Sequence, residues 1–242
     1  MRPFWNYYGG KFRSAPRYPA PRHNRIVEPF AGSAGYALRY HDRDVLLIDK
    51  DPAIAETWRF LIGASAADVM GIPLVESTRD LPDSVRDGAR LLVGFCMNSA
   101  AATPRVTLSA GSVALLARDR NMYGWGAARR NRVAAQVGHI KHWQVMCADY
   151  QLAPDVEATW FIDPPYERAG AHYRHGSKSI DFSGLATWCR QRQGQAIVCE
   201  ADGADWLPFV PFLSVKSFGR AGAVQRSHEV IWTNDPVPAS VA

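Results

Sequence analysis

Residues 159–166, Thr-Trp-Phe-Ile-Asp-Pro-Pro-Tyr, constrain the fold more than any other stretch of the chain. The run 159–162 is apolar and rich in β-prone residues, which predicts a buried strand. Pro164 and Pro165 must end that strand, because proline cannot donate to a ladder and fixes φ. The chain therefore turns a rigid corner at the carboxyl end of a strand, where open α/β sheets bind their ligands.

This corner offers three groups to a ligand: the carboxylate of Asp163, the carbonyl of Pro164 and the aromatic face of Tyr166. Together they suit an exocyclic amine on a flat ring, because the two oxygens accept N–H hydrogens and the ring stacks. The alternative is an ordinary exit from a strand with a solvated aspartate. Other stretches must decide between the two.

Further strands and helices alternate along the chain. Residues 45–49, Val-Leu-Leu-Ile-Asp, form a continuous apolar run ending in an acid, which predicts a buried parallel strand. The same reasoning places strands at 25–28, 143–148 and 196–200, an antiparallel pair at 214–218 and 229–233, and helices starting at 36, 53, 127 and 182. The alternation predicts an α/β fold with a Rossmann-like sheet.

A glycine-rich turn, Pro-Phe-Ala-Gly-Ser-Ala-Gly at 29–35, follows the first predicted strand. A strand, a glycine turn and a helix form the first half of a nucleotide-binding βαβ unit, although a generic turn remains the alternative. Small residues let a cofactor approach the backbone, so the candidate cofactor residues are Phe30, Ala31, Gly32, Ser33 and Gly35.

Asp49 ends the second predicted strand, 14 residues after Gly35. An acid at this position commonly binds ribose hydroxyls. Asp51 precedes Pro52 and is predicted to cap the next helix instead. Near the start of the chain, Tyr7-Tyr8-Gly9-Gly10-Lys11 combines paired glycines with a cation suited to a carboxylate, although a flexible loop with a solvated lysine is the alternative.

Composition sets the broad class of the protein. With 242 residues and 47% hydrophobic residues, the chain is expected to form one domain, or one domain plus an insertion. No apolar run approaches the ~20 residues that span a bilayer, and no signal peptide is evident, so a cytoplasmic protein is expected. The four cysteines, Cys96, Cys147, Cys189 and Cys199, lack Cys-x-x-Cys spacing, which predicts reduced thiols and no metal site.

Positive charge concentrates between residues 105 and 143. This segment holds seven Lys or Arg and one Asp, a local charge of +6, which leaves −1 for the rest of a chain of net charge +5. A regional excess predicts a face for an anionic partner. Arg129, Arg130 and Arg132 fall in the first turns of the predicted helix 127–140, where a bound phosphate would offset their conflict with the helix dipole. A solvated charge run is the alternative.

Taken together, these motifs resemble the Dam-like N6-adenine DNA methyltransferases, in a phage-associated branch. The resemblance rests on residues 7–11, which end in Gly-Gly-Lys, on residues 28–35, Asp49, Asp149-Tyr150, Asp-Pro-Pro-Tyr at 163–166 and the segment 200–209. It implies S-adenosylmethionine as the cofactor, with Lys11 on the methionine carboxylate, Tyr7 beside it and Asp49 on the ribose. Asp149 and Tyr150 would border the adenine ring.

One residue departs from the family pattern. The family usually has a second glycine where this chain has Ala34, which puts a very close backbone approach at that position in doubt. A shift of one residue to Gly35 would restore it. The resemblance also implies a catalytic domain formed by 1–57 and 144–242, with residues 58–143 as an inserted region that recognises double-stranded DNA.

The implied chemistry centres on the corner at 163–166. Asp163 and the Pro164 carbonyl would draw the amine hydrogens out of conjugation with the ring, and Tyr166 would stack on a flipped adenine. Arg105, in an arm at 105–112, is the candidate for reading a guanine edge. The alternatives are an enzyme acting on N4 of cytosine, on RNA or on a protein amide, and a catalytically silent nucleic-acid-binding protein.

Overall fold

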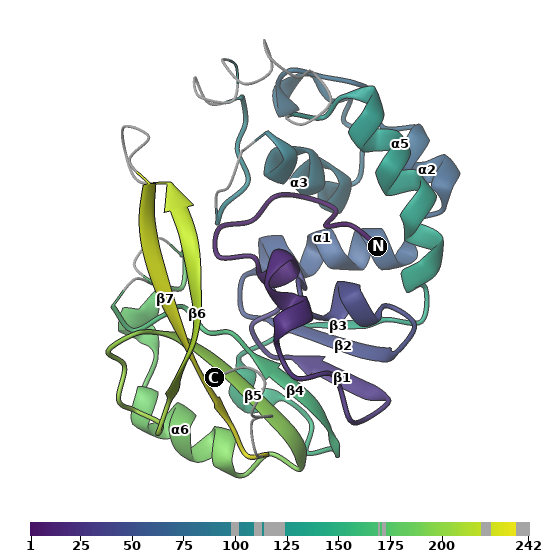
Figure 1. The fold of residues 1–242 in the computed structure, drawn as a ribbon. Coiled ribbons are helices and arrows are strands. Elements are labelled where there is room, and N and C mark those ends of the chain that lie inside the picture. The colour runs from purple at the N-terminus through teal and green to yellow at the C-terminus, as the bar shows by residue number, and fades with distance from the viewer. Residues whose placement is uncertain are drawn as a thin grey trace.

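A single seven-stranded sheet runs through the molecule in the order β3-β2-β1-β4-β5-β7-β6 (Figure 1). The computed structural model describes residues 1–97, 102–108, 113, 124–168, 170, 173–218 and 224–235. The strands are β1 (Arg25–Glu28), β2 (Asp44–Asp49), β3 (Gln144–Cys147), β4 (Ala158–Ile162), β5 (Gly194–Ala201), β6 (Val210–Phe218) and β7 (Val224–Thr233). All the strands predicted from the sequence are confirmed, with shifts of one or two residues at the ends of most of them, but β6 and β7 begin four and five residues earlier than predicted.

The sheet is mostly parallel. Neighbouring strands from β3 to β5 pair in parallel, whereas β7 is antiparallel to both β5 and β6. The fold is therefore mixed α/β and compatible with a Rossmann-like arrangement. Strands β1 and β4 lie side by side; β2 and β3 follow outward from β1 on one side, and β5 lies beyond β4 on the other. Such a reversal point is where ligands of open sheets bind.

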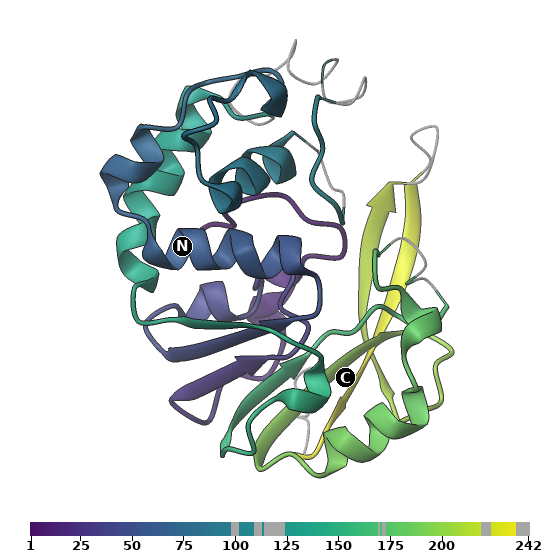
Figure 2. The ribbon, with the colours of Figure 1, turned by 180° about the vertical axis from the view of Figure 1, so that it is seen from behind.

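Helices cover both faces of the sheet (Figures 1 and 2). They are α1 (Pro52–Gly63), α2 (Ala66–Met70), α3 (Asp87–Cys96), α5 (Ala127–Gln136) and α6 (Phe182–Arg190), and the 3-10 turns include η1 (Lys11–Arg13), η2 (Ala15–Arg17), η3 (Ala37–Tyr40) and η5 (Val137–Ile140). Successive residues of β4 face opposite sides: Phe161 joins the core beneath α1, α3 and α5, and Trp160 joins the core beneath α6. The remaining 3-10 turns are η4 (Thr78–Asp80), η6 (Tyr150–Leu152) and η8 (Ser177–Ser179).

Within the described residues, no helix is long and apolar enough to cross a membrane.

Two local predictions are wrong. The helix expected to begin at residue 36 is a single 3-10 turn, η3. The N–H of Ala37 donates to Glu28, and few residues remain between the glycine turn and β2 in which a longer helix could form. The predicted helix 127–140 is α-helical only to Gln136 and continues as η5.

The predicted domain boundary after residue 57 is also wrong, because α1 crosses it. Aromatic contacts tie the N-terminal segment to the region beyond that boundary. Phe4 contacts Trp58 with ring centroids 5.7 Å apart, and Trp5 stacks on Phe95 at 5.3 Å. Residues 58–143 therefore share a hydrophobic core with the sheet instead of packing as a separate unit.

Candidate functional site

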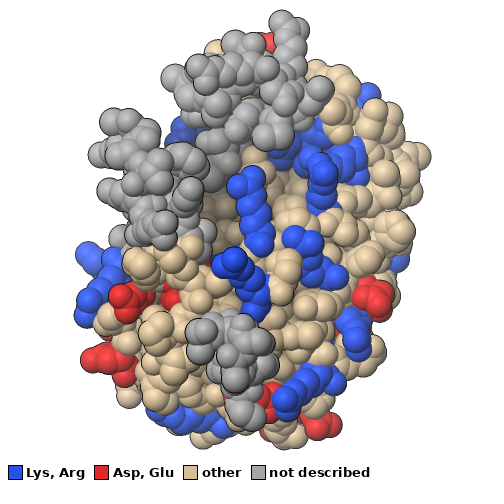
Figure 3. Space-filling model, in the orientation of Figure 1, with Lys and Arg blue, Asp and Glu red and all other residues tan. Residues whose placement is uncertain are grey.

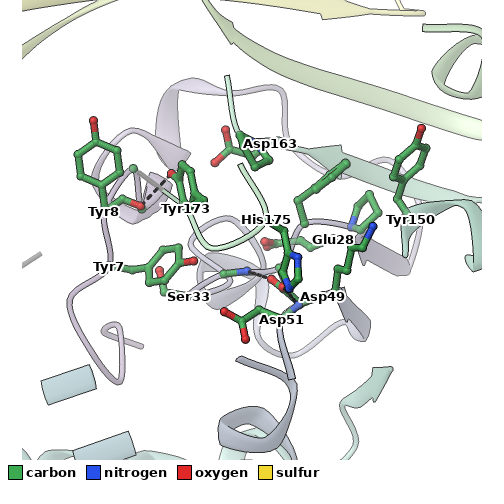
Figure 4. A pocket seen from close by; sticks show the side chains of 18 of the residues that line it. Tyr7, Tyr8, Glu28, Ser33, Asp49, Asp51, Tyr150, Asp163, Tyr173 and His175 are labelled. Atoms are coloured by element: carbon green, nitrogen blue, oxygen red, sulfur yellow. Dashed lines mark hydrogen bonds between the residues drawn. The ribbon is translucent and has the colours of Figure 1, made fainter. Parts of the chain in front are cut away.

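A cavity of about 920 Å³, including its opening to solvent, lies at the carboxyl ends of the central strands (Figure 4). All eleven residues predicted to bind a cofactor line it: Tyr7, Lys11, Phe30, Ala31, Gly32, Ser33, Gly35, Asp49, Asp149, Tyr150 and Asp163. These residues come from five separate parts of the sequence. Of the remaining corner residues, Pro165 lines the cavity, and Pro164 and Tyr166 are its neighbours in the chain.

The glycine turn is fixed by hydrogen bonds to its backbone. The N–H of Gly32 donates to Asp49 Oδ2 at 2.9 Å, and Trp58 Nε1 donates to the carbonyl of Gly32 at 2.8 Å. Gly32 has a φ of +44°, and a side chain there would come within 2.9 Å of the Tyr7 ring. The conformation and the contact both require glycine.

Asp49 supports the turn as well as lining the cavity. Its second oxygen, Oδ1, accepts the N–H of Asp51 at 2.9 Å. Burial raises the pKa of Asp49 to about 6, against the opposing effect of the two N–H donors. A carboxylate has about four acceptor positions, so Asp49 keeps capacity for ligand hydroxyls. Asp51 caps α1 as predicted, with Oδ1 accepting the N–H of Ala53 at 2.9 Å.

Gly35 has a structural role that the sequence analysis did not predict. A Cβ at this position would lie 2.5 Å from the backbone nitrogen of Phe12 and 2.8 Å from that of Lys11. The absent side chain thus makes room for η1 rather than for a ligand. Ala34, the departure from the family pattern, is buried and adopts a φ of +51°, which is unfavourable for a residue with a Cβ.

Lys11 is buried at the inner end of the cavity. Its Nζ lies 2.9 Å from Asp163 Oδ1 and 3.8 Å from Glu229 Oε1, and it donates to the carbonyl of Gly9 at 3.0 Å. Burial lowers the pKa of Lys11, but the neighbouring carboxylates, chiefly Asp163, outweigh this effect and hold the pKa above its ordinary value. The lysine is therefore charged, and it joins the N-terminal segment to the corner at 163–166.

The groups around this ion pair come from distant elements. Tyr18 donates to Glu229 Oε2 at 2.8 Å, and the Tyr166 ring lies with its centroid 4.9 Å from Lys11 Nζ. Burial raises the pKa of Asp163, and Lys11 opposes that increase. In the described part of the chain, no donor reaches the Pro164 carbonyl, which leaves it available as an acceptor. Stacking of a base on Tyr166 stays a prediction.

The sequence analysis placed Glu28 in a strand but did not predict that it belongs to the site. It ends β1, is 3% exposed, and its Oε1 accepts the N–H of Ala37 at 2.6 Å. Burial raises the pKa of Glu28 to about 8, while the hydrogen bond from Ala37 acts in the opposite direction. The available signal was an acid directly before a glycine-rich turn, at the end of an otherwise apolar strand.

Stability is therefore expected to depend on pH through Glu28. A carboxyl group whose pKa rises on folding stabilises the fold below its unfolded pKa of about 4.5, and this contribution is lost as the pH rises through about 8. We expect the slope from this residue to approach roughly 1.4 kcal/mol per pH unit within that window. Glu28→Gln should flatten the decline in urea unfolding measured at pH 5.5, 7 and 8.5. Glu157→Gln, at a side chain that is 71% exposed, should not.

A second missed element is the segment 173–180, which contributes Tyr173, Arg174, His175, Ser179 and Ile180 to the cavity wall. The hydroxyl of Tyr173 donates to the carbonyl of Tyr8 at 3.2 Å, and Figure 4 shows Tyr7, Tyr8 and Tyr173 together on one side of the cavity, opposite Tyr150. An aromatic and basic cluster shortly after the corner was the signal for this wall.

The arginines predicted to clamp phosphate have other partners. Arg129 is 2% exposed and lies against Cys96, so its assignment to a DNA phosphate is wrong. Arg130 donates to the carbonyl of Ile72 at 3.1 Å, and Arg132 donates to that of Pro3 at 3.4 Å. Their guanidinium groups thus hold neighbouring backbone in place. Arg105 is exposed, and the rest of its predicted arm, 109–112, lies outside the described residues.

The charge of the cavity wall favours a cationic ligand. Four aspartates line it, Asp49, Asp51, Asp149 and Asp163, against three cations, Lys11, Lys50 and Arg174. Glu28 also lines it, but burial raises its pKa to about 8, so it is mostly neutral at pH 7. A site with excess carboxylate attracts a ligand that carries a positive centre. Among the described residues, no group of three His, Cys, Asp or Glu side chains is placed to hold a metal ion.

Comparisons with known proteins add little. No protein-family model matches the sequence. No curated protein sequence matches it. Among solved structures, a conserved hypothetical protein from Streptococcus pyogenes aligns with 92% of this chain and 93% of its own, at 10% identity and a TM-score of 0.37. A likeness this weak carries no argument about function.

Proposed function

We propose that the protein is an S-adenosylmethionine-dependent methyltransferase that modifies the N6 amino group of adenine in double-stranded DNA. The observation that carries this proposal is the position of Asp163. It directly follows β4 and lines the same cavity as the glycine turn and Asp49. One carboxylate for an amine and one for a ribose would therefore share this cavity. The motif resemblance described above agrees with this arrangement.

The walls of the cavity suit the proposed cofactor. Phe30 and Tyr150 pack together, with ring centroids 5.3 Å apart, and form an aromatic wall for a nucleobase. Asp49 has acceptor capacity for ribose hydroxyls, and the excess of carboxylates favours a sulfonium. When bound, S-adenosylmethionine supplies a methyl group on a good leaving group, so the protein needs no nucleophile of its own.

The residues of this chain would act on the amine. Its nitrogen is a poor nucleophile because its lone pair is delocalised into the ring. Asp163 and the Pro164 carbonyl would each accept a hydrogen bond from one N–H of the amine, which directs the lone pair of the nitrogen away from the ring. Holding the reacting atoms in line can supply several kcal/mol of the barrier. An adenine within a duplex cannot reach Asp163, so the base must flip out.

The proposal is tested by cofactor binding and by the product. Titration calorimetry should detect S-adenosylmethionine binding to the purified protein. Single-molecule sequencing of DNA from a methylation-free host that expresses the protein should reveal N6-methyladenine at a defined site. If N4-methylcytosine is found instead, the target base is cytosine. If the protein does not bind the cofactor, the proposal that it is a methyltransferase is rejected.

Asp49→Asn should weaken S-adenosylmethionine binding by about 10- to 100-fold, because a hydrogen bond to a charged group contributes roughly 1.5–3 kcal/mol. Asp44→Asn is the matched control, since Asp44 begins the same strand at the opposite edge of the sheet and pairs with Arg25. Calorimetry on both variants, with circular dichroism as a check on folding, measures the difference. Equal S-adenosylmethionine affinity in the two variants would show that Asp49 does not bind the cofactor.

A further inference from the structure

The N-terminal segment carries positive charge without any acid. Residues 1–27 contain six Lys or Arg and no Asp or Glu, a local charge of +6 that exceeds the net charge of +5 of the whole chain. Figure 3 shows Lys and Arg side chains along the middle of the face on which this segment lies, with acidic side chains only towards the margins. This excess is separate from the one at 105–143.

Within this surface, three exposed arginines have no carboxylate partner in the described part of the chain: Arg13, Arg17 and Arg39. Their neighbours differ, since Arg22 pairs with Asp235 at 3.0 Å and Arg25 pairs with Asp44 at 3.6 Å. The three unpaired arginines form the surface that we call the N-terminal basic face.

Local packing holds this face together. Arg39 donates twice to the carbonyl of Phe12, at 3.2 and 3.1 Å, and its guanidinium lies 4.1 Å from the centroid of the Phe12 ring. Arg39 is thereby fixed beside the turn that carries Arg13. Ser14 donates to the carbonyl of Lys11 at 3.1 Å and links η1 to η2, which carries Arg17. The cations are thus presented by ordered backbone.

The face adjoins the cavity. A single 3-10 turn, η1, places Lys11 inside the cavity and exposes Arg13 to solvent. Gly35 holds that turn against the glycine loop through backbone contact. An anion bound at Arg13 would therefore lie one turn of chain from the ion pair between Lys11 and Asp163.

We infer that the N-terminal basic face binds the phosphate backbone of the nucleic acid whose base enters the cavity. The inference rests on the proposed function for the identity of that base. Arginine favours phosphate because its guanidinium donates to two oxygens at once. A membrane surface fits less well, since binding at an interface requires apolar side chains beside the cations. Of the large exposed apolar side chains in the described residues, Tyr8 lines the cavity, and the others lie outside the N-terminal segment: Met70, Leu74, Val106, Val113, Leu152 and Val210.

Salt-dependent binding tests the inference. The variants are Arg13→Ala, Arg17→Ala and the double variant, and the matched control is Arg190→Ala, an exposed arginine at the end of α6. Binding of a labelled DNA duplex is measured by fluorescence anisotropy at four salt concentrations, with duplex RNA and anionic phosphatidylserine vesicles as further probes. Each removed phosphate contact should lower the slope of log K against log salt by about one.

We expect the double variant to lose about two units of slope on duplex DNA, while the control keeps the wild-type slope and all variants keep wild-type cofactor affinity. A wild-type slope in the double variant overturns the inference, as does a loss of vesicle binding without a loss of DNA binding. A failure of the proposed function gives a different result from a failure of this inference. Cofactor binding and methyl transfer would then be absent, while the arginine substitutions would still lower the salt slope of DNA binding. If the substitutions weaken binding to duplex RNA more than binding to duplex DNA, the N-terminal basic face still binds a phosphate backbone, but the polymer is RNA.

Discussion

Asp163→Ala is expected to reduce methyl transfer to DNA by at least 10²–10³-fold, the effect typical of removing one preorganised polar group at a reacting centre. In the proposed mechanism, the substitution removes the acceptor that orients the amine. It also leaves Lys11, which is 5% exposed, with Glu229 at 3.8 Å as its remaining carboxylate partner. Breaking a buried ion pair costs roughly 3–5 kcal/mol, so lower stability should accompany the loss of activity.

Asp163→Asn separates these two effects, because the amide keeps the shape of the side chain and one acceptor oxygen. We expect it to remain folded at 25 °C and still to transfer methyl groups far more slowly than the wild type. Transfer of radiolabelled methyl groups gives the rate, and thermal unfolding gives the stability. Asp155→Asn is the control, since Asp155 precedes the same strand and its side chain is 66% exposed. Wild-type turnover by Asp163→Asn would show that its charge has no role in orienting the amine.

Activity should also fall as the pH is lowered. Burial raises the pKa of Asp163, although Lys11 opposes the change, so the carboxyl protonates at a higher pH than an ordinary aspartate does. A protonated Asp163 is a weaker acceptor for the amine hydrogens.

Gly35→Ala is expected to destabilise the protein and to weaken cofactor binding at the same time. The new methyl group would meet backbone nitrogen at 2.5 and 2.8 Å, and backbone cannot rotate away as a flexible side chain can. Overpacking typically costs 1–3 kcal/mol, and the displaced segment is η1, which carries Lys11. Chemical denaturation and calorimetry with S-adenosylmethionine measure the two effects.

The matched control is Gly63→Ala, at the last residue of α1, where an added Cβ meets nothing within 4 Å. This change should be neutral or stabilise the protein by up to about 1 kcal/mol, because alanine loses less backbone entropy in a helix than glycine does. Equal stability and equal cofactor affinity in Gly35→Ala and Gly63→Ala would mean that η1 can shift without consequence.

The strands and the cavity wall were predictable because their signals are local. Residues 45–49 and 159–162 are continuous apolar runs, and continuous runs of that length bounded by turn residues favour buried strands. The ends of parallel strands meet at one edge of a sheet, so acids at those ends, such as Asp49 and Asp163, had to lie near one another. The cavity that contains both confirms this part of the reasoning.

The errors concern contacts between distant residues. Arg129 was predicted to bind phosphate because it falls in the first turns of a helix within a basic segment, yet the packing of α5 buries it against Cys96, which is 33 residues away. The role of Gly35 depends on Phe12, and the segment 173–180 lies at the cavity through contacts with Tyr8 and Asp51, which are more than 120 residues away. Local pattern and propensity carry no information about such partners.

The link between Tyr18 and Glu229 also bears on how the protein acquires its site during synthesis. The two residues are 211 positions apart, and Glu229 belongs to β7, which pairs with the parallel part of the sheet in the reverse direction. Contacts of such long range form slowly, because the chain must close a large loop before it gains their energy. A nascent chain that has passed β4 therefore holds Asp163 but has not yet completed the charge environment of Lys11. The second carboxylate beside Lys11 becomes available only after the last described strand has emerged from the ribosome.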